Sequence, residues 1–252
     1  MTAVTRLGAG PAGRLGLGAR RTRPGGASYN PHVPEHLPEV TPQLVREDLT
    51  EEQLQAFLRA PQVAVDTETL GLHPLRDRLC VVQVCDRAGR VVLVQVPREQ
   101  LTRPGPATDR APRLKRLLEE PAVLKVLHFA RFDLAALKHN LGIDVAPIYC
   151  TRTASKLIRT YTERHGLRDL ALELLDIEMD KSVRHTDWAS LDLTPEQVRY
   201  AAADVTLLLT LMDRLNVMLE REERRALADE CFRVIATLVR LDLLGYEDLF
   251  IH

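Results

Sequence analysis

The chain has 252 residues, of which 45% are hydrophobic and 27% are charged, and its formal net charge is −1. Both fractions are ordinary for a soluble globular protein, and the length suits one well-buried domain with extensions. A net charge near zero excludes nucleic-acid binding through a global positive field, so any such contact requires a local basic patch. No apolar stretch approaches the roughly 18 residues of a membrane span, so we expect no membrane partner.

Residues 1–38 combine several arginines with abundant glycine and proline, and they contain no acid before Glu35. This composition predicts a disordered tail in front of the folded part. An organellar transit peptide is the alternative, but glycine and proline would interrupt the amphipathic helix that such a peptide forms.

The cysteines share apolar surroundings and lack the C-x₂-C spacing that is typical of zinc ligands. They are Cys80, Cys85, Cys150 and Cys231. This pattern predicts buried, reduced thiols in a cytoplasmic protein rather than disulfides or a zinc site.

The first half of the folded part predicts one short helix and then several strands. Thr50–Gln53 has the form of a capping box and begins a helix that Pro61 ends. The elements expected after it are strands over 63–66, 79–84 and 91–96, a proline-rich loop over 102–112 and a helix near 113–119. The turn Asp86–Gly89 joins the second and third of these strands into a hairpin.

From Val123 onward, strands and helices alternate. The elements expected there are a strand over 123–129, a helix over 133–140, a strand over 144–149, helices over 152–161 and 167–175, a long helix over 195–219 and a last helix that Gly245 ends. An antiparallel start followed by β-α-β units predicts an α/β fold, a mixed five-stranded sheet with helices on both faces. The domain is expected to span residues 45–220, followed by a C-terminal helix and apolar tail over 221–252.

Two acids, Asp66 and Glu68, follow an apolar run within the stretch Val63–Leu72. Side chains alternate along a strand, so both carboxylates leave it on the same side. Two ionised acids close together repel, and their desolvation is costly unless a cation shares the site. Oxygen ligands at this spacing suit a hard divalent ion, Mg²⁺ or Mn²⁺. For an isolated motif, an acid pair at a strand end is the alternative.

Two further acids lie on predicted helices. Asp204 follows Tyr200 by four residues, so the carboxyl and the phenol share one helix face, and the three alanines between them allow close approach to another element. Asp133 stands where a helix follows the buried strand over 123–129. Taken alone, Asp204 suits a solvent-exposed surface, and Asp133 suits a helix N-terminus, where the helix dipole favours an acid.

Together these motifs resemble the DEDD superfamily of 3′–5′ exonucleases. Tyr200 marks the DEDDy branch, and Arg199 does not fit the histidine branch. Within that branch the chain resembles RNase D. The stretches that carry this resemblance are Asp66–Thr69, His128–Leu134, Asp180–Ser182, Asp187–Trp188 and Leu193–Asp204.

RNase D carries helical RNA-binding domains after its catalytic domain, whereas only roughly 30 residues follow the catalytic helices here. The chain is more similar to the nanoRNase C family, compact bacterial enzymes that degrade very short RNA. The stretches that carry this closer resemblance are Asp66–Leu72, Arg76–Gln83, Cys150–Gly166 and Leu241–Gly245.

The resemblance implies an RNase H-like fold and a site for two divalent ions. Asp66, Glu68 and Asp204 would hold the first ion, Asp66 would also bridge to the second, and Asp133 would complete the site. Tyr200 would orient the attacking water. The products would be nucleoside 5′-monophosphates.

The resemblance also implies a dinucleotide substrate and a homo-oligomer in the form of an octameric ring. A leucine matching Leu72 separates two bases in the dinucleotide-degrading relatives, and a basic cap closes over the 5′ phosphate. The apolar C-terminal residues are the expected oligomer contact. For Leu72, the alternative is that it only packs the turn around Gly71.

Positive charge for the substrate phosphates is expected between Thr151 and Arg168. Arg152, Lys156 and Arg159 stand at i, i+4 and i+7, which predicts a basic stripe on one helix face. Lys156 and His165 are the candidates for the cap, and His128 is a further expected substrate contact. The alternative for each cation is an ordinary solvated helix surface. Trp188 is expected in the core rather than as a stacking platform.

Two other functions stay open from the sequence. A proofreading or repair DNA exonuclease would use the same chemistry, and contacts to the 2′-hydroxyl that separate RNA from single-stranded DNA are not legible in the residues. A non-catalytic nucleic-acid-binding scaffold is disfavoured, because all four acids and the tyrosine are present.

Overall fold

The computed structural model of the chain describes residues 40–179, 186–246 and 249. The expected disordered tail of residues 1–38 and the stretch Asp180–Ser182 lie outside these residues. Within the described part, none of the helices combines the length and the apolar character needed to cross a membrane.

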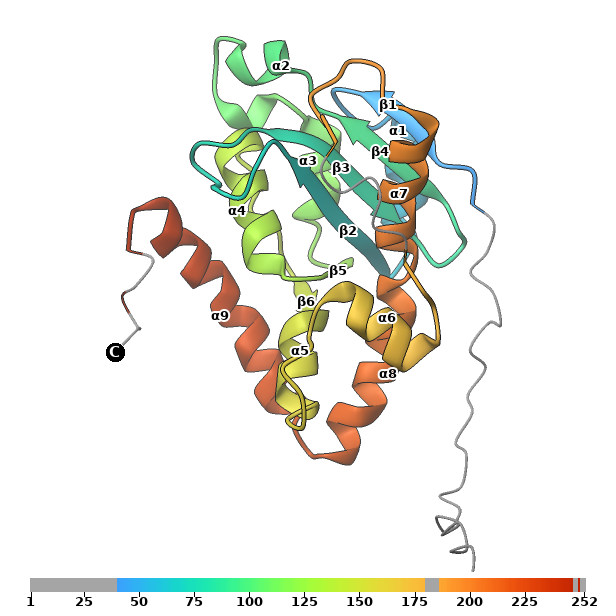
Figure 1. The fold of residues 1–252 in the computed structure, drawn as a ribbon. Coiled ribbons are helices and arrows are strands. Elements are labelled where there is room, and N and C mark those ends of the chain that lie inside the picture. Colours follow the sequence, from blue (N-terminus) through green and yellow to red (C-terminus); the bar gives the residue numbers. More distant parts are fainter. Residues whose placement is uncertain (1–39, 180–185, 247–248, 250–252) are drawn as a thin grey trace, which may run out of the picture. The chain divides into compact units, whose positions relative to one another are not determined.

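A mixed sheet of six strands forms the centre of the fold, in the order β1-β4-β3-β2-β5-β6 (Figure 1). The strands are β1 (Gln43–Arg46), β2 (Gln62–Thr69), β3 (Leu79–Cys85), β4 (Val91–Gln95), β5 (Leu124–Leu127) and β6 (Ile148–Cys150). β2, β3 and β4 pair antiparallel, as the hairpin pattern predicts, and β5 and β6 extend the sheet in parallel. Every residue of β3 and β4 is buried, which accounts for their continuous apolar runs.

The expectation of five strands was short by one, because β1 was not predicted. Its residues Gln43–Arg46 show no alternation of buried and exposed side chains. The strand exists through parallel pairing with β4, and the chain beyond it is fixed by a hydrogen bond from the Glu47 N–H to the Gln95 carbonyl of 2.9 Å. Pairing between segments this far apart leaves no local pattern to find.

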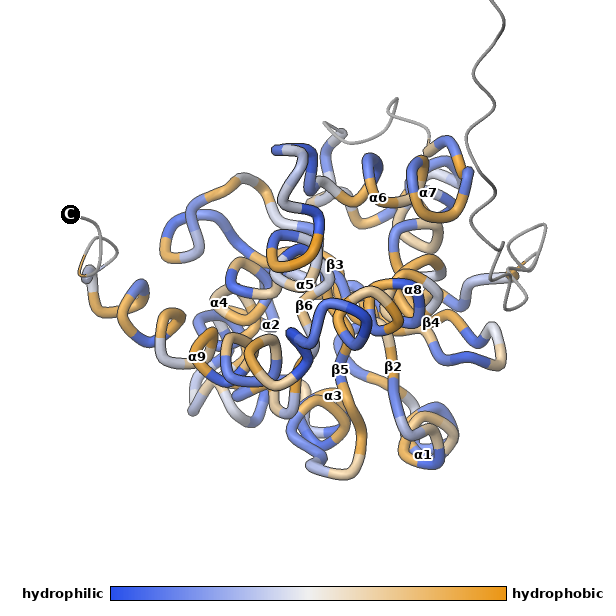
Figure 2. The backbone as a smooth tube through the Cα atoms, turned by 90° about the horizontal axis from the view of Figure 1, so that it is seen from below, coloured by the Kyte–Doolittle hydropathy of each residue, from blue (hydrophilic) through white to orange (hydrophobic). Residues whose placement is uncertain are grey.

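Helices cover both faces of the sheet, as expected. They are α1 (Glu51–Leu58), α2 (Arg98–Thr102), α3 (Pro112–Leu118), α4 (Ala130–Leu141), α5 (Thr151–Ile158), α6 (Leu167–Leu175), α7 (Pro195–Thr206), α8 (Leu208–Arg221) and α9 (Arg225–Leu243), with a 3₁₀ turn η1 at Ala107–Asp109. α7 packs on β2, β3 and β4, while α9 packs on α4 and β6 (Figure 1). Figure 2 shows apolar and polar residues alternating along α9, as a helix with one buried side requires.

The single helix expected over 195–219 is two helices, α7 and α8, that meet at Leu207. The Thr206 hydroxyl donates to the Ala203 carbonyl at 3.0 Å, so a side chain competes for an acceptor of the helical backbone. The start of α7 follows the prediction, with Thr194 as N-cap of a capping box and Pro195 in the first turn.

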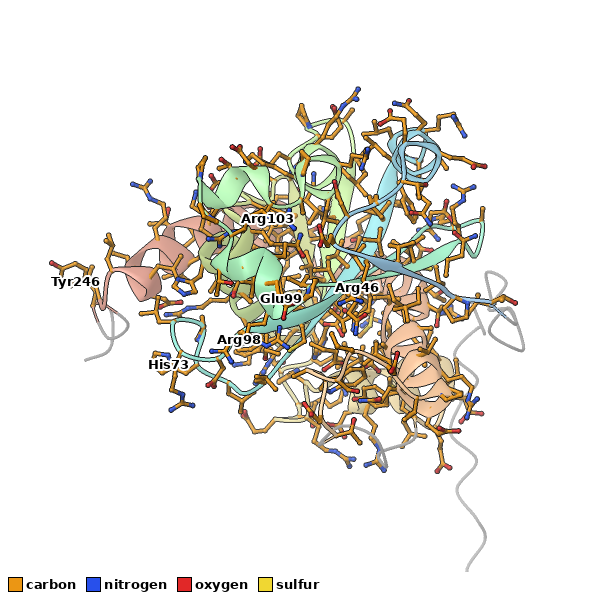
Figure 3. All side chains as sticks on the ribbon, turned by 90° about the horizontal axis from the view of Figure 1, so that it is seen from above. Arg46, His73, Arg98, Glu99, Arg103 and Tyr246 are labelled. Atoms are coloured by element: carbon orange, nitrogen blue, oxygen red, sulfur yellow. The ribbon has the colours of Figure 1, made fainter. Side chains whose placement is uncertain are left out.

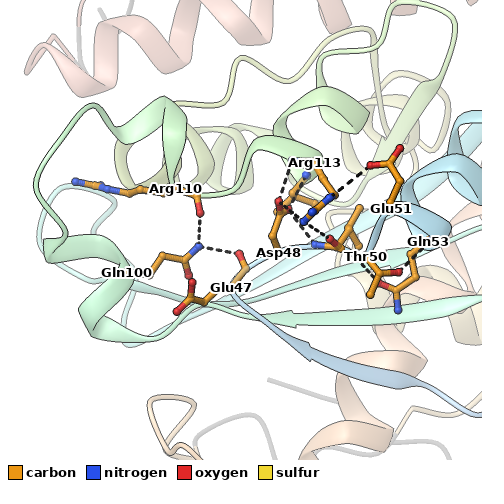
Figure 4. Close-up of polar contacts among 10 residues, drawn as sticks. Glu47, Asp48, Thr50, Glu51, Gln53, Gln100, Arg110 and Arg113 are labelled. Carbon is orange, nitrogen blue, oxygen red and sulfur yellow. Dashed lines mark hydrogen bonds and ion pairs between the residues drawn. The ribbon is translucent and has the colours of Figure 1, made fainter.

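The connection after β1 ties the first strand to α2 and α3 (Figure 4). The Asp48 carboxylate accepts hydrogen bonds from the backbone N–H groups of Arg113 and Leu114 at 2.9 and 2.8 Å, and thereby caps α3 from outside. The Gln100 amide donates to the carbonyls of Glu47 and Arg110, both at 2.7 Å. These contacts hold the segment after β1, at one edge of the sheet, against α2 and α3.

Candidate active site

Strand β2 presents the first two acids at a place where the sheet is open on one side. β5 pairs only with Gln62–Ala64, so the second half of β2 has a strand neighbour only in β3. Asp66 and Glu68 lie in that second half, where strand alternation points both carboxylates the same way. The end of β5 therefore leaves room beside the acids for another element.

Helix α7 brings the third acid to the same place. Ala201 and Ala202 are buried, and these small side chains let the helix lie directly on the sheet. Carboxylate oxygens of Asp66, Glu68 and Asp204 all lie within 4.8 Å of one another. The three acids that the sequence singled out for the first cation are thus a physical cluster.

Asp133 lies on the first turn of α4, on the side of β2 that β5 leaves open. The Thr67 hydroxyl donates to its carboxylate at 2.6 Å, which links it to the strand between Asp66 and Glu68. The helix begins at Ala130 rather than at Asp133, three residues earlier than expected, and Asp133 is buried. Burial raises the pKa of this carboxyl to about 7, although the bond from Thr67 works in the opposite direction.

Burial and charge repulsion together oppose ionisation in the cluster. Burial raises the pKa of Asp66 well above its ordinary value, and the charges of Asp133, Asp204 and Glu68 raise it further. In the protein alone, ionisation of this carboxyl is therefore strongly opposed. A bound cation would remove the opposition, and a set of carboxylate oxygens is the donor set that hard divalent ions prefer.

Gln83 is a polar residue beside the acids that the sequence analysis did not select. It pairs with Asp66 across β2 and β3 and is fully buried, and neither atom of its amide has a hydrogen-bond partner among the described residues. A buried amide without partners is rare and calls for a water or an ion nearby. This observation fits a hydrated cation at the cluster. A glutamine inside an apolar strand would have been the only sequence signal.

Tyr200 stands one helical turn before Asp204 and contacts the ring of Trp188, with ring centroids 6.1 Å apart. Trp188 is buried, as predicted for a core residue. Burial raises the pKa of the Tyr200 phenol, and the charges of Asp204 and Glu68 raise it further. The phenol therefore stays protonated at neutral pH, and its phenolate is not available as a base.

The loop between β2 and β3 carries Leu72, whose side chain is 82% exposed. The loop is held by Asp77, which accepts a hydrogen bond from the His73 N–H at 2.9 Å and forms an ion pair with Arg76 at 2.8 Å. A Cβ atom at Gly71 would lie 2.2 Å from an oxygen of the Asp77 carboxylate, so a larger residue there would displace the side chain that holds the loop. The structure thus places an exposed leucine on a braced turn directly after the acids.

A basic cavity of about 620 Å³ lies on another side of the same loop, bounded by α2 and the end of α4. Its lining includes the arginines Arg76, Arg78, Arg98 and Arg110 together with His139. In Figure 3, Arg98 on α2 and His73 on the loop lie on the same face of the molecule. The sequence did not reveal this group, because its members come from separate segments.

Comparisons with known proteins agree with this geometry. A family model described as a 3′–5′ exonuclease matches residues 43–220. The chain belongs to the 3′–5′ exonuclease family.

The relatives place this exonuclease in the DEDDy branch of the RNase D-like group. They include NrnC, which is the nanoRNase C named above. A solved structure of Brucella melitensis NrnC with bound Mg²⁺ is 41% identical, with a TM-score of 0.76, and the match covers 84% of this chain and 100% of that chain. The same protein bound to pGG is 42% identical, with a TM-score of 0.76 and coverage of 84% and 99%.

The Ribonuclease D of Gluconacetobacter diazotrophicus is 34% identical over 178 residues, which are 71% of this chain and 42% of that protein. The exonuclease thus spans less than half the length of this curated relative, whereas its match covers the whole NrnC chain. The mixed sheet agrees with the RNase H-like fold of these neighbours.

The prediction that Arg159 belongs to a basic stripe on α5 is wrong. α5 ends at Ile158, so Arg159 leaves the helical face. Its guanidinium is fully buried, donates to the Arg164 carbonyl at 2.7 Å and to the Ser155 hydroxyl at 3.0 Å, and pairs with Glu173. This arginine holds the α5–α6 connection together.

The other expected substrate contacts differ in exposure. Lys156 is exposed on α5, whereas His165 is buried with its Nδ1 atom 2.9 Å from the Ser155 hydroxyl, which disfavours direct contact with a phosphate. His128 is half-buried, and its Nδ1 atom lies 2.9 Å from the Thr151 hydroxyl. Burial lowers the pKa of His128 to about 3, so this ring is neutral at neutral pH.

Replacing one acid of the cluster tests whether it is a cation site. Asp66→Asn or Asp204→Asn keeps the side-chain volume and removes one repelling charge, so the thermal midpoint in EDTA should stay the same or rise. The increase in midpoint that excess Mg²⁺ gives the wild type should be lost, because a ligand stabilises only the state that binds it. Differential scanning calorimetry measures both values.

Asp192→Asn, which changes an exposed acid outside the cluster, serves as the control and should keep the Mg²⁺ response. An unchanged Mg²⁺ response in both cluster variants would contradict the cation site.

Proposed function

We propose that this exonuclease hydrolyses very short RNA from the 3′ end, with a preference for dinucleotides, and releases nucleoside 5′-monophosphates. The observation that carries the proposal is the exposed Leu72 on a braced turn directly after the acid cluster. The relative that was solved bound to pGG supports this substrate class. A longer substrate or single-stranded DNA is the alternative that the experiments below distinguish.

Two divalent ions, Mg²⁺ or Mn²⁺, are the proposed cofactors. Asp66, Glu68 and Asp204 would hold one ion, Asp66 would be shared with the second, and Asp133 would complete the site directly or through water. Support comes from the oxygen-only donor set, the unpartnered Gln83 amide and the relative solved with Mg²⁺. When bound, the ions would supply positive charge that activates water and stabilises the departing 3′ oxygen.

The remaining chemistry belongs to side chains of the chain itself. Tyr200 would donate its phenolic hydrogen bond or accept one from the attacking water, and so fix the direction of attack. A raised pKa rules out proton abstraction by the phenolate at neutral pH. The hydrogen bond from Thr67 would keep the Asp133 carboxylate in place while the charge of the reacting group beside it changes.

Leu72 would separate the two bases of the substrate. An apolar side chain packs against any base, so the contact does not depend on the base sequence of the RNA. It depends instead on the length of the RNA. Lys156 is the proposed cationic contact for the 5′ phosphate, and the neutral His128 a proposed substrate contact beside it. His165 would act by positioning the segment through Ser155 rather than by touching phosphate.

We further propose that the enzyme works in the cytoplasm. Cys80, Cys85, Cys150 and Cys231 are free thiols in the structure, and burial raises the pKa of Cys80 to about 11 and that of Cys85 to about 12. Buried thiols of this kind are inert and suit a reducing compartment.

Tyr200→Phe tests the role of the phenol. The loss of one oriented polar group near a transition state typically lowers the rate about 10²–10³-fold. We therefore expect the turnover number on short RNA to fall by that amount, while binding measured in Ca²⁺ stays close to that of the wild type. A turnover number equal to that of the wild type would make Tyr200 a packing residue only.

A competition between 5′-phosphorylated two-mer and seven-mer RNA tests the dinucleotide preference. The wild type should bind the two-mer more tightly, because Leu72 between the bases and the cationic contact at the 5′ phosphate together fit two nucleotides. Leu72→Ala should lose most of this preference, whereas Leu75→Ala, which changes another partly exposed leucine of the same loop, should keep it. Equal affinity of the wild type for both lengths would leave a general RNase D-like exonuclease, and faster cleavage of the matching DNA would favour the DNA enzyme.

We propose that the enzyme assembles into a homo-oligomer, an octameric ring by its similarity to nanoRNase C, through the end of α9. Leu244, Tyr246 and Leu249 are exposed at 69%, 58% and 53%. Figure 3 shows Tyr246 projecting from the end of α9, away from the sheet. Exposed apolar groups gathered at one place usually contact a partner surface. Phe250 and Ile251, which were expected to join them, lie outside the described residues.

Leu244→Glu should shift the mass measured by light scattering from an assembly much larger than a dimer toward smaller species, because a charge in an apolar contact is costly to desolvate. Val217→Glu, on an exposed position of α8, is the matched control and should leave the mass unchanged. A monomeric wild type would contradict the proposal.

A further inference from the structure

Phe129 has a backbone conformation that bulky residues rarely adopt. It lies between β5 and α4 with φ 60° and ψ 43°, the left-handed region. In this region the side chain of an L-residue crowds its own backbone, and only glycine, asparagine and aspartate enter it readily. The Phe132 N–H donates to the Phe129 carbonyl at 3.1 Å, so the strained residue begins the turn that leads into the helix.

Packing does not compensate for this strain. The Phe129 side chain is 47% exposed. Within the described chain it belongs neither to the buried core nor to the half-buried apolar residues that pack against the core. A strained residue that gains little from burial is typical of functional sites rather than of structural ones.

Arg152 holds the ring from one side. Its guanidinium carbon lies 4.3 Å from the centroid of the Phe129 ring, the geometry of a cation–π contact. Among the described residues Arg152 forms no ion pair, so no carboxylate balances the charge of the arginine.

The pair lies at the junction that leads to Asp133. Phe129 is the N-cap residue of α4, and Asp133 follows on the first turn of that helix. Thr151 ties the start of α5 to the same junction, because its hydroxyl donates to the Leu127 carbonyl at 3.2 Å and lies 2.9 Å from His128 Nδ1. An aromatic ring and a cation without an ion-pair partner in the described part of the chain thus lie at the same chain junction as Asp133, the fourth acid of the site.

We propose that Phe129 and Arg152 form a stacking subsite that takes one nucleobase of the RNA substrate. The base lies on the ring of Phe129, and Arg152 holds the other side of that ring and attracts the phosphate next to the base. Every base offers a flat face, so this subsite accepts any sequence, as aromatic platforms for single strands do. The inference rests on the proposed function, since it assumes that short RNA is the substrate.

The test replaces Phe129 by glycine, which adopts a positive φ without strain. Phe129→Gly should keep or raise the thermal midpoint, because the strain is relieved. Its dissociation constant for a fluorescent 5′-phosphorylated dinucleotide, measured in Ca²⁺, should rise on the order of 10-fold, as loss of one base stack does.

Dinucleotides that lack one base identify the stacked position. For the abasic dinucleotide that lacks the stacked base, wild type and Phe129→Gly should bind equally. Arg152→Met should weaken binding of both the complete and the abasic form, because the phosphate loses its cation. Tyr161→Leu, which removes another exposed aromatic ring near an arginine, is the control and should bind as the wild type does.

A lower thermal midpoint together with unchanged affinity in Phe129→Gly would overturn the subsite and leave the ring a structural role. Asp66→Asn separates this failure from failure of the proposed function. If Asp66→Asn is inactive while Phe129→Gly binds normally, only the subsite is wrong. If Asp66→Asn hydrolyses RNA as the wild type does, the proposed active site is wrong as well.

Discussion

Repulsion between carboxylates that are held close together is the constraint on which the rest of this structure depends. Asp66, Glu68 and Asp204 would move apart into solvent if the backbone allowed it, since their proximity opposes ionisation. The backbone does not allow it, because β2 is an inner strand of the sheet and α7 lies on that sheet through alanines. The well-packed core therefore holds these carboxylates in positions where their ionisation is unfavourable unless a cation is bound.

Because β5 is short, it leaves one side of the second half of β2 open. A longer β5 would continue to pair with β2 and cover the side on which Asp133 now meets Thr67. Because β5 stops at Leu127, the chain turns at once into α4, and this turn carries both Asp133 and the strained Phe129. The position of the acids and the access of a substrate thus follow from one strand end.

The features that the sequence predicted are those that a local period controls. A strand alternates every second residue and a helix repeats near every fourth, so the spacings of Asp66 with Glu68 and of Tyr200 with Asp204 directly imply shared faces. The capping boxes at Thr50 and Thr194 are local in the same way, and both helices begin where expected.

The features that escaped prediction depend on contacts between distant segments or on a single backbone angle. β1 forms through pairing with β4, and Arg159 is buried because α5 ends one residue before it. Gln83 is informative only once Asp66 is known to lie opposite. The conformation of Phe129 has no sequence signal at all, since phenylalanine is among the residues least suited to it.

The alternation of side chains along β2 also limits which mutations this segment can accept during evolution. Asp66 and Glu68 leave the strand on one side, whereas Val63 and Val65 occupy the alternate positions and are fully buried in the core. Loss or gain of a single residue ahead of Asp66 would exchange the two sets, so that valines would replace the acids and acids would enter the core. A substitution along this strand changes one side chain, whereas a one-residue insertion or deletion would abolish folding and chemistry together. Natural length variation in this family is therefore expected in the loops and tails, and not between Gln62 and Glu68.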